Sequence, residues 1–243
     1  EAIVVGEPCG GIGKAHRDMM NGGRNRSIAQ RMARVIGRAG VVGSAWLMLA
    51  MGGCLAPQTT GEPAHTYRLG LDHGHDVRRP STDAPVLLVG MPQAEPGYDT
   101  TKMAYLKRPY EVEYYAVNQW AEQPSRMFGS LLIQTLGATG VWRAVVPWPS
   151  SIHGDFRLDS YGFAIQQEFL QNPSLVRVRV RAQLVDLKES RIVGIRAFER
   201  VEQAPTQDAY GGVVAANRAT AALLEEISSW LSVCLKRPQE CGR

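Results

Sequence analysis

The chain has 243 residues, with 27 basic and 23 acidic side chains, and a formal net charge of +4 at pH 7. Residues 1–53 hold 7 of the basic and 3 of the acidic side chains, so the rest of the chain carries 20 of each and is neutral. A neutral main part lacks the basic surface that binding to DNA or RNA requires, and we expect no nucleic-acid partner.

The first two segments read as sequence outside the folded part. Residues 1–30 show no sustained apolar period, and we expect a leader that is disordered or lies upstream of the true start. Residues 31–53 are typical of a secretory signal peptide, because an uncharged apolar stretch follows a basic region. That stretch is shorter than the roughly 20 apolar residues that span a bilayer. Its basic region consists of Arg31, Arg34 and Arg38.

The end of the signal, Met51-Gly52-Gly53 followed by Cys54, resembles the lipobox of bacterial lipoproteins. In that family the signal is cleaved before the cysteine, which then carries the acyl chains. The resemblance implies that Cys54 is lipidated and that the mature chain is held at a membrane by its own N-terminus. Leu55 after the cysteine implies passage to the outer membrane. The alternative is an uncleaved membrane anchor with an ordinary buried cysteine.

Residues 54–85 combine proline and glycine with polar side chains, a composition that predicts a flexible tether. Within it, residues 66–69 read as a short strand. His73, His75 and Asp76 could form one corner of a metal site, but three potential ligands without a second cluster are weak evidence. We therefore expect a solvated linker here and no metal.

We expect the globular domain over residues 86–237 and a C-terminal tail over residues 238–243. Alternation and helical periodicity predict strands and two main helices. The order of these elements predicts a single α+β domain with an antiparallel sheet and both helices packed on one face. The predicted strands cover residues 86–89, 101–106, 111–115, 141–146, 157–170, 176–184 and 191–201, and the helices run from Pro124 to about Gly137 and from Gly211 to about Lys236.

The strand over residues 176–184 has the clearest alternation, with apolar residues between Arg177, Arg179 and Arg181. Such a pattern is typical of a half-buried antiparallel strand with a basic outer face. The arginine row could bind an acidic partner or phosphate. We favour a solvated sheet face on which the arginines pair with nearby carboxylates.

Aromatic residues gather in the first half of the domain, with Tyr110, Tyr114 and Trp120 as the candidates for contact with a partner. Tyrosine and tryptophan are strong interface anchors, but they also fill cores, and we expect both uses here. Cys234 and Cys241 flank a turn at Pro238. In an oxidising compartment they could form a short-loop disulfide, and the alternative is a buried free Cys234.

Four passages together resemble the ABC-type transport auxiliary lipoprotein family, over a range from about Tyr67 to Leu235. Members of this family, which include the paraquat-inducible lipoprotein C group, accompany mammalian-cell-entry (MCE) type lipid transport systems. The most specific passage is Tyr210-Gly-Gly-Val-Val-Ala-Ala-Asn-Arg-Ala219. The other three are the aromatic passage from Tyr105 to Pro124, the run from Leu131 to Gly140 and the segment Arg181-Ala-Gln-Leu-Val-Asp186.

The resemblance implies a non-enzymatic component without a cofactor. An ATPase and a permease sit in the inner membrane, an MCE-domain protein carries lipid across the periplasm, and the lipoprotein docks to it on the periplasmic side of the outer membrane. Tyr210, Gly211 and Gly212 match the family motif and are further candidate contacts, or they have a structural role. A homo-oligomer is left open.

Two other classes of function compete with this reading. A periplasmic hydrolase would need a nucleophile elbow, which the sequence lacks, and His153 is the only histidine of the globular part that could act as its base. A structural envelope lipoprotein that assists assembly of another outer-membrane complex is the second alternative. Neighbouring genes for an ATPase, a permease and an MCE protein would favour the transport function over the structural one.

Overall fold

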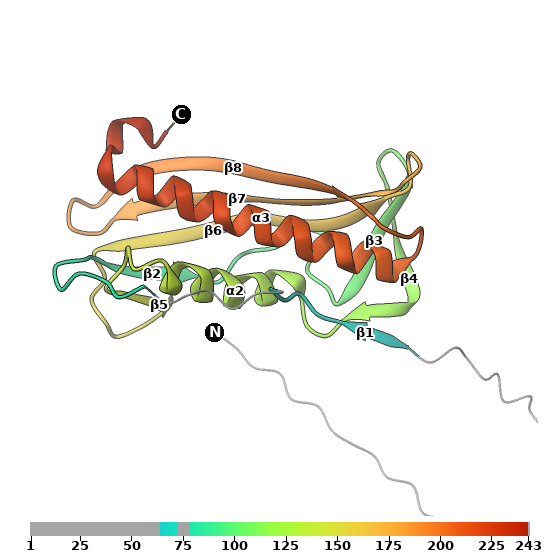
Figure 1. The fold of residues 1–243 in the computed structure, drawn as a ribbon, viewed down its shortest axis with the longest axis horizontal. Helices are drawn as coiled ribbons and strands as arrows, with labels where there is room; N and C mark the ends of the chain where they lie inside the picture. The colour runs from blue at the N-terminus through green and yellow to red at the C-terminus, as the bar shows by residue number, and fades with distance from the viewer. Residues whose placement is uncertain (1–63, 72–77, 243) are drawn as a thin grey trace, which may run out of the picture. The chain divides into compact units, whose positions relative to one another are not determined.

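A computed structural model describes residues 64–71 and 78–242, all within one compact unit from Thr60 to Arg243. The expectations for the leader, the signal peptide, Cys54 and the candidate metal corner at His73, His75 and Asp76 lie outside the described residues. In the described part, two long helices lie on one face of a single sheet (Figure 1). Neither helix combines the length and the apolar composition that crossing a bilayer requires.

The sheet has eight strands, and the chain ends in a long helix followed by a short 3-10 turn. The strands are β1 (His65–Tyr67), β2 (Val86–Gly90), β3 (Lys102–Arg108), β4 (Glu111–Trp120), β5 (Ala144–Trp148), β6 (Phe156–Glu168), β7 (Leu175–Asp186) and β8 (Arg191–Gln203). The helices are α2 (Pro124–Ala138), α3 (Ala209–Lys236) and the 3-10 helix η1 (Pro238–Glu240).

The sheet is mixed, so the expectation of a purely antiparallel sheet is wrong. Strands β6, β7 and β8 form an antiparallel meander, as expected. Along the other edge of β6, β2 and β3 both run parallel to it, and β5 and β1 add further parallel pairs. The loop between β2 and β3 keeps this direction, because Ala94 forms a parallel bridge with Phe163. The chain from β2 to β3 thus follows one edge of the longer strand β6.

The face of the sheet beneath the helices is the core, and the alternation in β7 places it there. Val176, Val178, Val180, Ala182 and Leu184 are each at most 2 % exposed. Helix α3 packs on β7 and β8, whereas α2 packs on β2, β5 and β6 and against α3. The apolar stripe of α3 that meets this face includes Leu223, Leu224, Ile227, Trp230 and Leu231.

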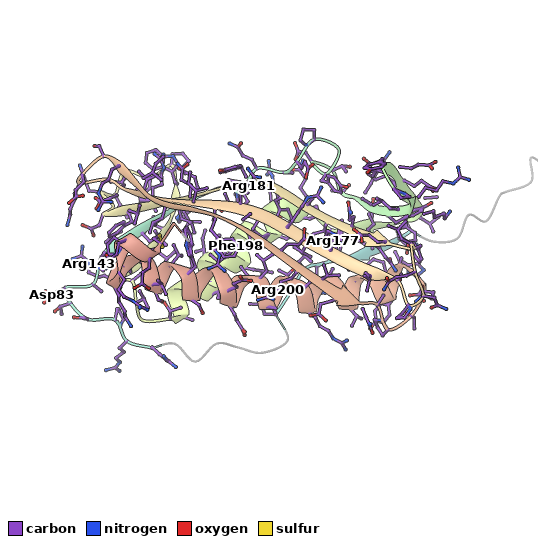
Figure 2. The ribbon with its side chains drawn as sticks, turned by 90° about the horizontal axis from the view of Figure 1, so that it is seen from above. Asp83, Arg143, Arg177, Arg181, Phe198 and Arg200 are labelled. Atoms are coloured by element: carbon purple, nitrogen blue, oxygen red, sulfur yellow. A yellow bond between two sulfur atoms is a disulfide. The ribbon has the colours of Figure 1, made fainter. Side chains whose placement is uncertain are left out.

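The arginine row of β7 lies on the other face and is largely paired with carboxylates, as favoured from the sequence. Arg177 Nε donates to Glu168 Oε1 at 2.8 Å, and the same guanidinium also pairs with Glu199. Arg179 Nη2 donates to Glu95 Oε2 at 2.7 Å. Arg181 is exposed on the side of the sheet away from α3 (Figure 2). Burial alone would raise the pKa of Glu168, but hydrogen bonds from Arg177 and Gln166 outweigh it and lower that pKa.

Strand β5 continues through a proline that was expected to end it. The predicted strand stopped before Pro147, but β5 runs on to Trp148. Strand β5 pairs only with β2 among the described strands, so it is an edge strand. A proline is tolerated at such an edge, because its missing N–H removes no hydrogen bond when that side faces outward.

The packed part of the chain includes residues upstream of the expected domain start at Val86. Strand β1 pairs with the end of β4, and Leu69 is 5 % exposed. The side chain of Asn217 fixes this segment to α3, because its Oδ1 accepts a hydrogen bond from the Gly70 N–H at 2.7 Å. Asn217 lies among the apolar residues of α3, and this hydrogen bond gives its side chain the partner that a polar group needs there.

The C-terminal residues fold back on α3 through a disulfide between Cys234 and Cys241, whose Cα atoms are 4.6 Å apart. Both cysteines are at most 1 % exposed. The indole Nε1 of Trp230 donates to the Cys241 carbonyl oxygen at 2.8 Å. Residues 238–241 are thereby held against the last turns of the helix.

Replacing both Cys234 and Cys241 by alanine should lower the free energy of unfolding by about 2–3 kcal/mol. The reason is that a cross-link across a sequence separation of 7 reduces the conformational entropy of the unfolded chain by an amount of that size. Denaturant unfolding of the oxidised protein and of the double variant measures the difference. Mass spectrometry of periplasmic protein under non-reducing conditions is the control, and two free thiols in the wild type would contradict the bridge.

Candidate docking surface

The hairpin between β3 and β4 carries the most exposed aromatic residue of the described chain. Arg108 pairs with Glu111, so Pro109 and Tyr110 form the tip. Tyr110 is fully exposed, with a relative accessibility of 102 %, and its φ is +68°. A bulky residue in this left-handed region is uncommon, because its Cβ is crowded by the backbone there. The tip therefore presents an aromatic ring to solvent on a backbone that favours glycine.

Two more apolar side chains continue from the tip along β4. Val112 and Tyr114 lie at alternate positions of β4 and so share one face of the strand, next to the turn that carries Tyr110. Val112 is 39 % and Tyr114 36 % exposed. The Tyr114 hydroxyl donates to the Gly97 carbonyl oxygen at 2.7 Å, and the Lys102 ammonium lies 5.7 Å from the centre of its ring. Tyr114 is thus exposed but held in one position.

The carboxylates of the hairpin each pair with a cation. Lys107 pairs with Glu113 at 3.6 Å, and Arg108 pairs with Glu111 at 3.8 Å. The Tyr105 hydroxyl donates to Glu113 Oε2 at 2.6 Å, and this hydrogen bond is the main reason that the pKa of Glu113 is lowered. Exposed pairs of this kind contribute little stability. With Lys102 at the start of β3, the hairpin has three cations and two carboxylates, and its net charge is only +1.

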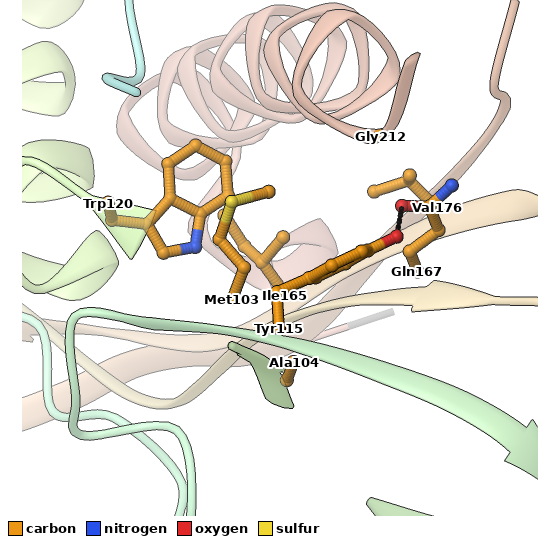
Figure 3. Close-up of a pocket in the computed structure, with 8 residues that line it drawn as sticks. All are labelled: Met103, Ala104, Tyr115, Trp120, Ile165, Gln167, Val176 and Gly212. Carbon is orange, nitrogen blue, oxygen red and sulfur yellow. Dashed lines mark hydrogen bonds between the residues drawn. The ribbon is translucent and has the colours of Figure 1, made fainter. Parts of the chain in front are cut away.

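Trp120, in contrast, is 3 % exposed and belongs to the core, so we withdraw it as a contact residue. Its indole lies with Met103 and Ile165 at a small cavity beneath α3 (Figure 3). The cavity has a volume of about 10 Å³. That is room for about one water molecule, and far too little for a lipid chain.

The two glycines of the family motif have structural roles, and Gly212 lines this cavity. A Cβ at Gly212 would strike the amide of Gln167, and one at Gly211 would strike Thr206. The Gln167 amide cannot move away freely. Its Oε1 accepts from the Tyr115 hydroxyl at 3.0 Å (Figure 3), and its Nε2 donates to Ser174 Oγ at 3.0 Å. Glycine at position 212 therefore lets the first turn of α3 approach the sheet, and glycine at position 211 lets it approach the preceding loop.

Tyr210 is the aromatic member of the motif, and it reaches solvent. It is 61 % exposed, and the centre of its ring lies 6.3 Å from that of Tyr67 on β1. Asp208 caps the helix beside it, since its Oδ1 accepts from the Gly211 N–H at 2.7 Å. This hydrogen bond is also the main reason that the pKa of Asp208 is lowered.

The hydrolase alternative gains no support from the described residues. His153 lies exposed in the loop between β5 and β6. Within residues 64–71 and 78–242, no group of three or more His, Cys, Asp or Glu side chains could hold a metal ion.

Sequence reasoning missed Val112 and the strain at Tyr110. A Pro-Tyr pair between two alternating runs does signal a turn, because proline favours its first central position. Which tyrosines reach solvent depends on strand pairing, which the sequence does not specify.

Comparison with known proteins agrees with this architecture. A family model described as the ABC-type transport auxiliary lipoprotein component matches residues 67–228. The crystal structure of a Xanthomonas campestris protein of the DUF330 family has a TM-score of 0.61 at 18 % identity and covers 72 % of this chain and 99 % of that one. The crystal structure of another uncharacterised protein has a TM-score of 0.54 at 13 % identity. It covers 70 % of this chain and 99 % of that one. A comparison with curated proteins gave no match.

At these identities the two crystal structures show a shared fold and nothing more. The family match carries the assignment, because it covers most of the chain and runs from β1 into α3. The family resemblance found in the sequence is therefore confirmed. The chain belongs to the ABC-type transport auxiliary lipoprotein family, a family of lipoproteins that are auxiliary components of ABC-type transport.

Proposed function

We propose that this protein is the lipoprotein of an MCE-type lipid transport system. It is anchored through acyl chains on Cys54 at the periplasmic face of the outer membrane, and it docks there to the MCE-domain protein without catalysis of its own. The observation that carries this proposal is the family match over residues 67–228.

The distance from the proposed anchor to the fold supports a role next to the membrane. Cys54 and His65, the first residue of β1, are separated by 11 Cα–Cα steps. A fully extended chain of that length spans at most about 40 Å. The folded unit therefore stays close to the membrane, while most of its surface faces the periplasm.

The exposed tyrosines are the proposed contacts with the MCE-domain protein. Tyr110, Tyr114 and Tyr210 offer aromatic rings to solvent, and such rings are common anchors of protein interfaces. Gly211 and Gly212 contribute indirectly, because they set the position of the α3 turn that carries Tyr210. Trp120 contributes only to the core.

Capture of the MCE-domain protein of the same organism by the full-length lipidated protein in detergent tests this function. We expect a stable complex, and we expect deletion of the gene to change the lipid balance of the outer membrane. An unrelated lipoprotein with the same anchor is the control for capture. If neither capture nor a lipid phenotype is found, the structural role in another envelope complex replaces the transport role.

A further inference from the structure

We infer that Tyr110, Val112 and Tyr114, here termed the hairpin stripe, are the anchor of the docking surface, and that Tyr110 inserts into an apolar pocket of the partner protein. This inference rests on the proposed function, because it assigns a surface and a binding mode to the same partner. It comes from three independent features of the hairpin: its backbone, its exposure and its charge.

The backbone at the tip shows that tyrosine is not there for the fold. Pro109 fixes the first central position of the turn, and the second position, Tyr110, has φ +68°. Turns with positive φ at that position strongly favour glycine or asparagine. The ring of Tyr110 is fully exposed, so it gains no packing within the chain in return. Strained residues that the fold does not require are typical of functional contacts.

The exposure of the stripe continues along a strand with a free edge. Strand β1 pairs only with residues 118–120 of β4, so in the described chain no strand covers the outer edge of β4 over residues 111–117. The side chains of Val112 and Tyr114 are themselves exposed, at 39 % and 36 %, so a partner can reach them as well as the tip. Tyr114 is already fixed by its hydrogen bond to Gly97, and a side chain held in place loses little rotamer entropy on binding.

The charge of the hairpin favours a protein pocket over a lipid surface. Anionic membranes attract clusters of lysine and arginine, but here Lys107 and Arg108 are each paired with a carboxylate. Lys102 is the one further cation, so the net charge of the hairpin is only +1. Glu111 and Glu113 would also be repelled by anionic headgroups. A rim of such low net charge around an exposed aromatic ring instead suits an apolar pocket, and the affinity of such a contact depends only weakly on ionic strength.

Titration of the full-length lipidated protein in detergent with the purified MCE-domain protein tests the stripe. Tyr110→Gly should weaken capture by about 30-fold or more, which is the loss expected at an interface hot spot. Its melting temperature should be equal to or higher than that of the wild type, because glycine relieves the strain at the turn. Raising the salt concentration threefold should change the wild-type affinity by less than about threefold.

Ile152→Gly is the matched control, because Ile152 is also an exposed apolar loop residue, at 52 %. It precedes the start of β6, whereas the hairpin lies beside the end of β6, where Leu106 pairs with Glu168. Ile152→Gly should leave capture unchanged. Equal capture by Tyr110→Gly and the wild type would contradict the role of the hairpin stripe as the docking anchor. The proposed function would not be affected by that result.

A photo-crosslinking amino acid at position 110 in living cells separates the kinds of partner. We expect an adduct with the MCE-domain protein, identified by mass spectrometry, and none from the same group at position 152. An adduct with lipid, an adduct with a second copy of the chain, or no adduct would overturn the inference. If the wild type also fails to capture the MCE-domain protein, the proposed function falls with it.

Discussion

Replacing Trp120 by alanine should lower the free energy of unfolding by about 3–5 kcal/mol, the range for removal of a large buried aromatic side chain. Trp120 is 3 % exposed, and its indole packs beside Met103 and Ile165 (Figure 3). The cavity already present there is only about 10 Å³, so the space left by the indole is new. The strands around it cannot close that space fully. The variant therefore loses the free energy gained by burying the indole, and the cavity that remains destabilises it further.

Denaturant unfolding of the isolated variant measures this cost, with Tyr114→Ala as the control. Tyr114 is 36 % exposed and makes one hydrogen bond to the Gly97 carbonyl oxygen, so its removal should cost about 1 kcal/mol. A loss of less than about 1 kcal/mol for Trp120→Ala would contradict its place in the core. The two aromatic residues lie on the same strand, so the pair separates core packing from surface contact.

The elements with a strong period were predictable from the sequence. Strand β7 alternates over its whole length because one face lies beneath α3 and the other meets carboxylates such as Glu168 and Glu95. Helix α3 shows a continuous apolar stripe for the same reason, since it crosses the core from end to end. Gly211 and Gly212 predicted a helix start near position 211, and α3 begins two residues earlier, at Ala209.

Strand direction was not predictable, because alternation is the same for parallel and antiparallel neighbours. The parallel pairing of β2 and β3 with β6 depends on the path of their connecting loop, which Ala94 fixes by a single bridge to Phe163. The extension of β5 through Pro147 depends likewise on which strand lies at the edge. Both features are tertiary and leave no local signal.

The candidate site was predictable only in part, because burial of an aromatic residue follows from sheet topology. Tyr110 and Trp120 are both aromatic residues near one hairpin, yet one is fully exposed and the other buried. Trp120 is buried because its indole lies on the face of the sheet beneath α3, beside Met103 and Ile165 (Figure 3). The role of Gly212 depends on the position of Gln167, a residue 45 positions earlier in the chain.

Replacing Cys54 by alanine should abolish fatty-acid labelling and release the protein from the membrane fraction. The physical reason is the size of the acyl contribution, about 0.8 kcal/mol for each buried CH₂, which nothing in the neutral remainder of the chain can replace. Labelling of cells with a radioactive fatty acid, followed by fractionation, measures both effects. They should be nearly complete, because two or more chains hold a protein firmly where a single chain does not.

The double variant of Cys234 and Cys241 is the matched control, because it also removes cysteines but leaves the lipobox-like sequence intact. It should keep its label and its membrane location while losing stability. If the wild type takes up no fatty acid and fractionates as a soluble periplasmic protein, the anchor at Cys54 is wrong. The folded unit would then no longer be held within a limited distance of the membrane, because the limit of about 40 Å between the anchor and β1 holds only for a lipidated Cys54.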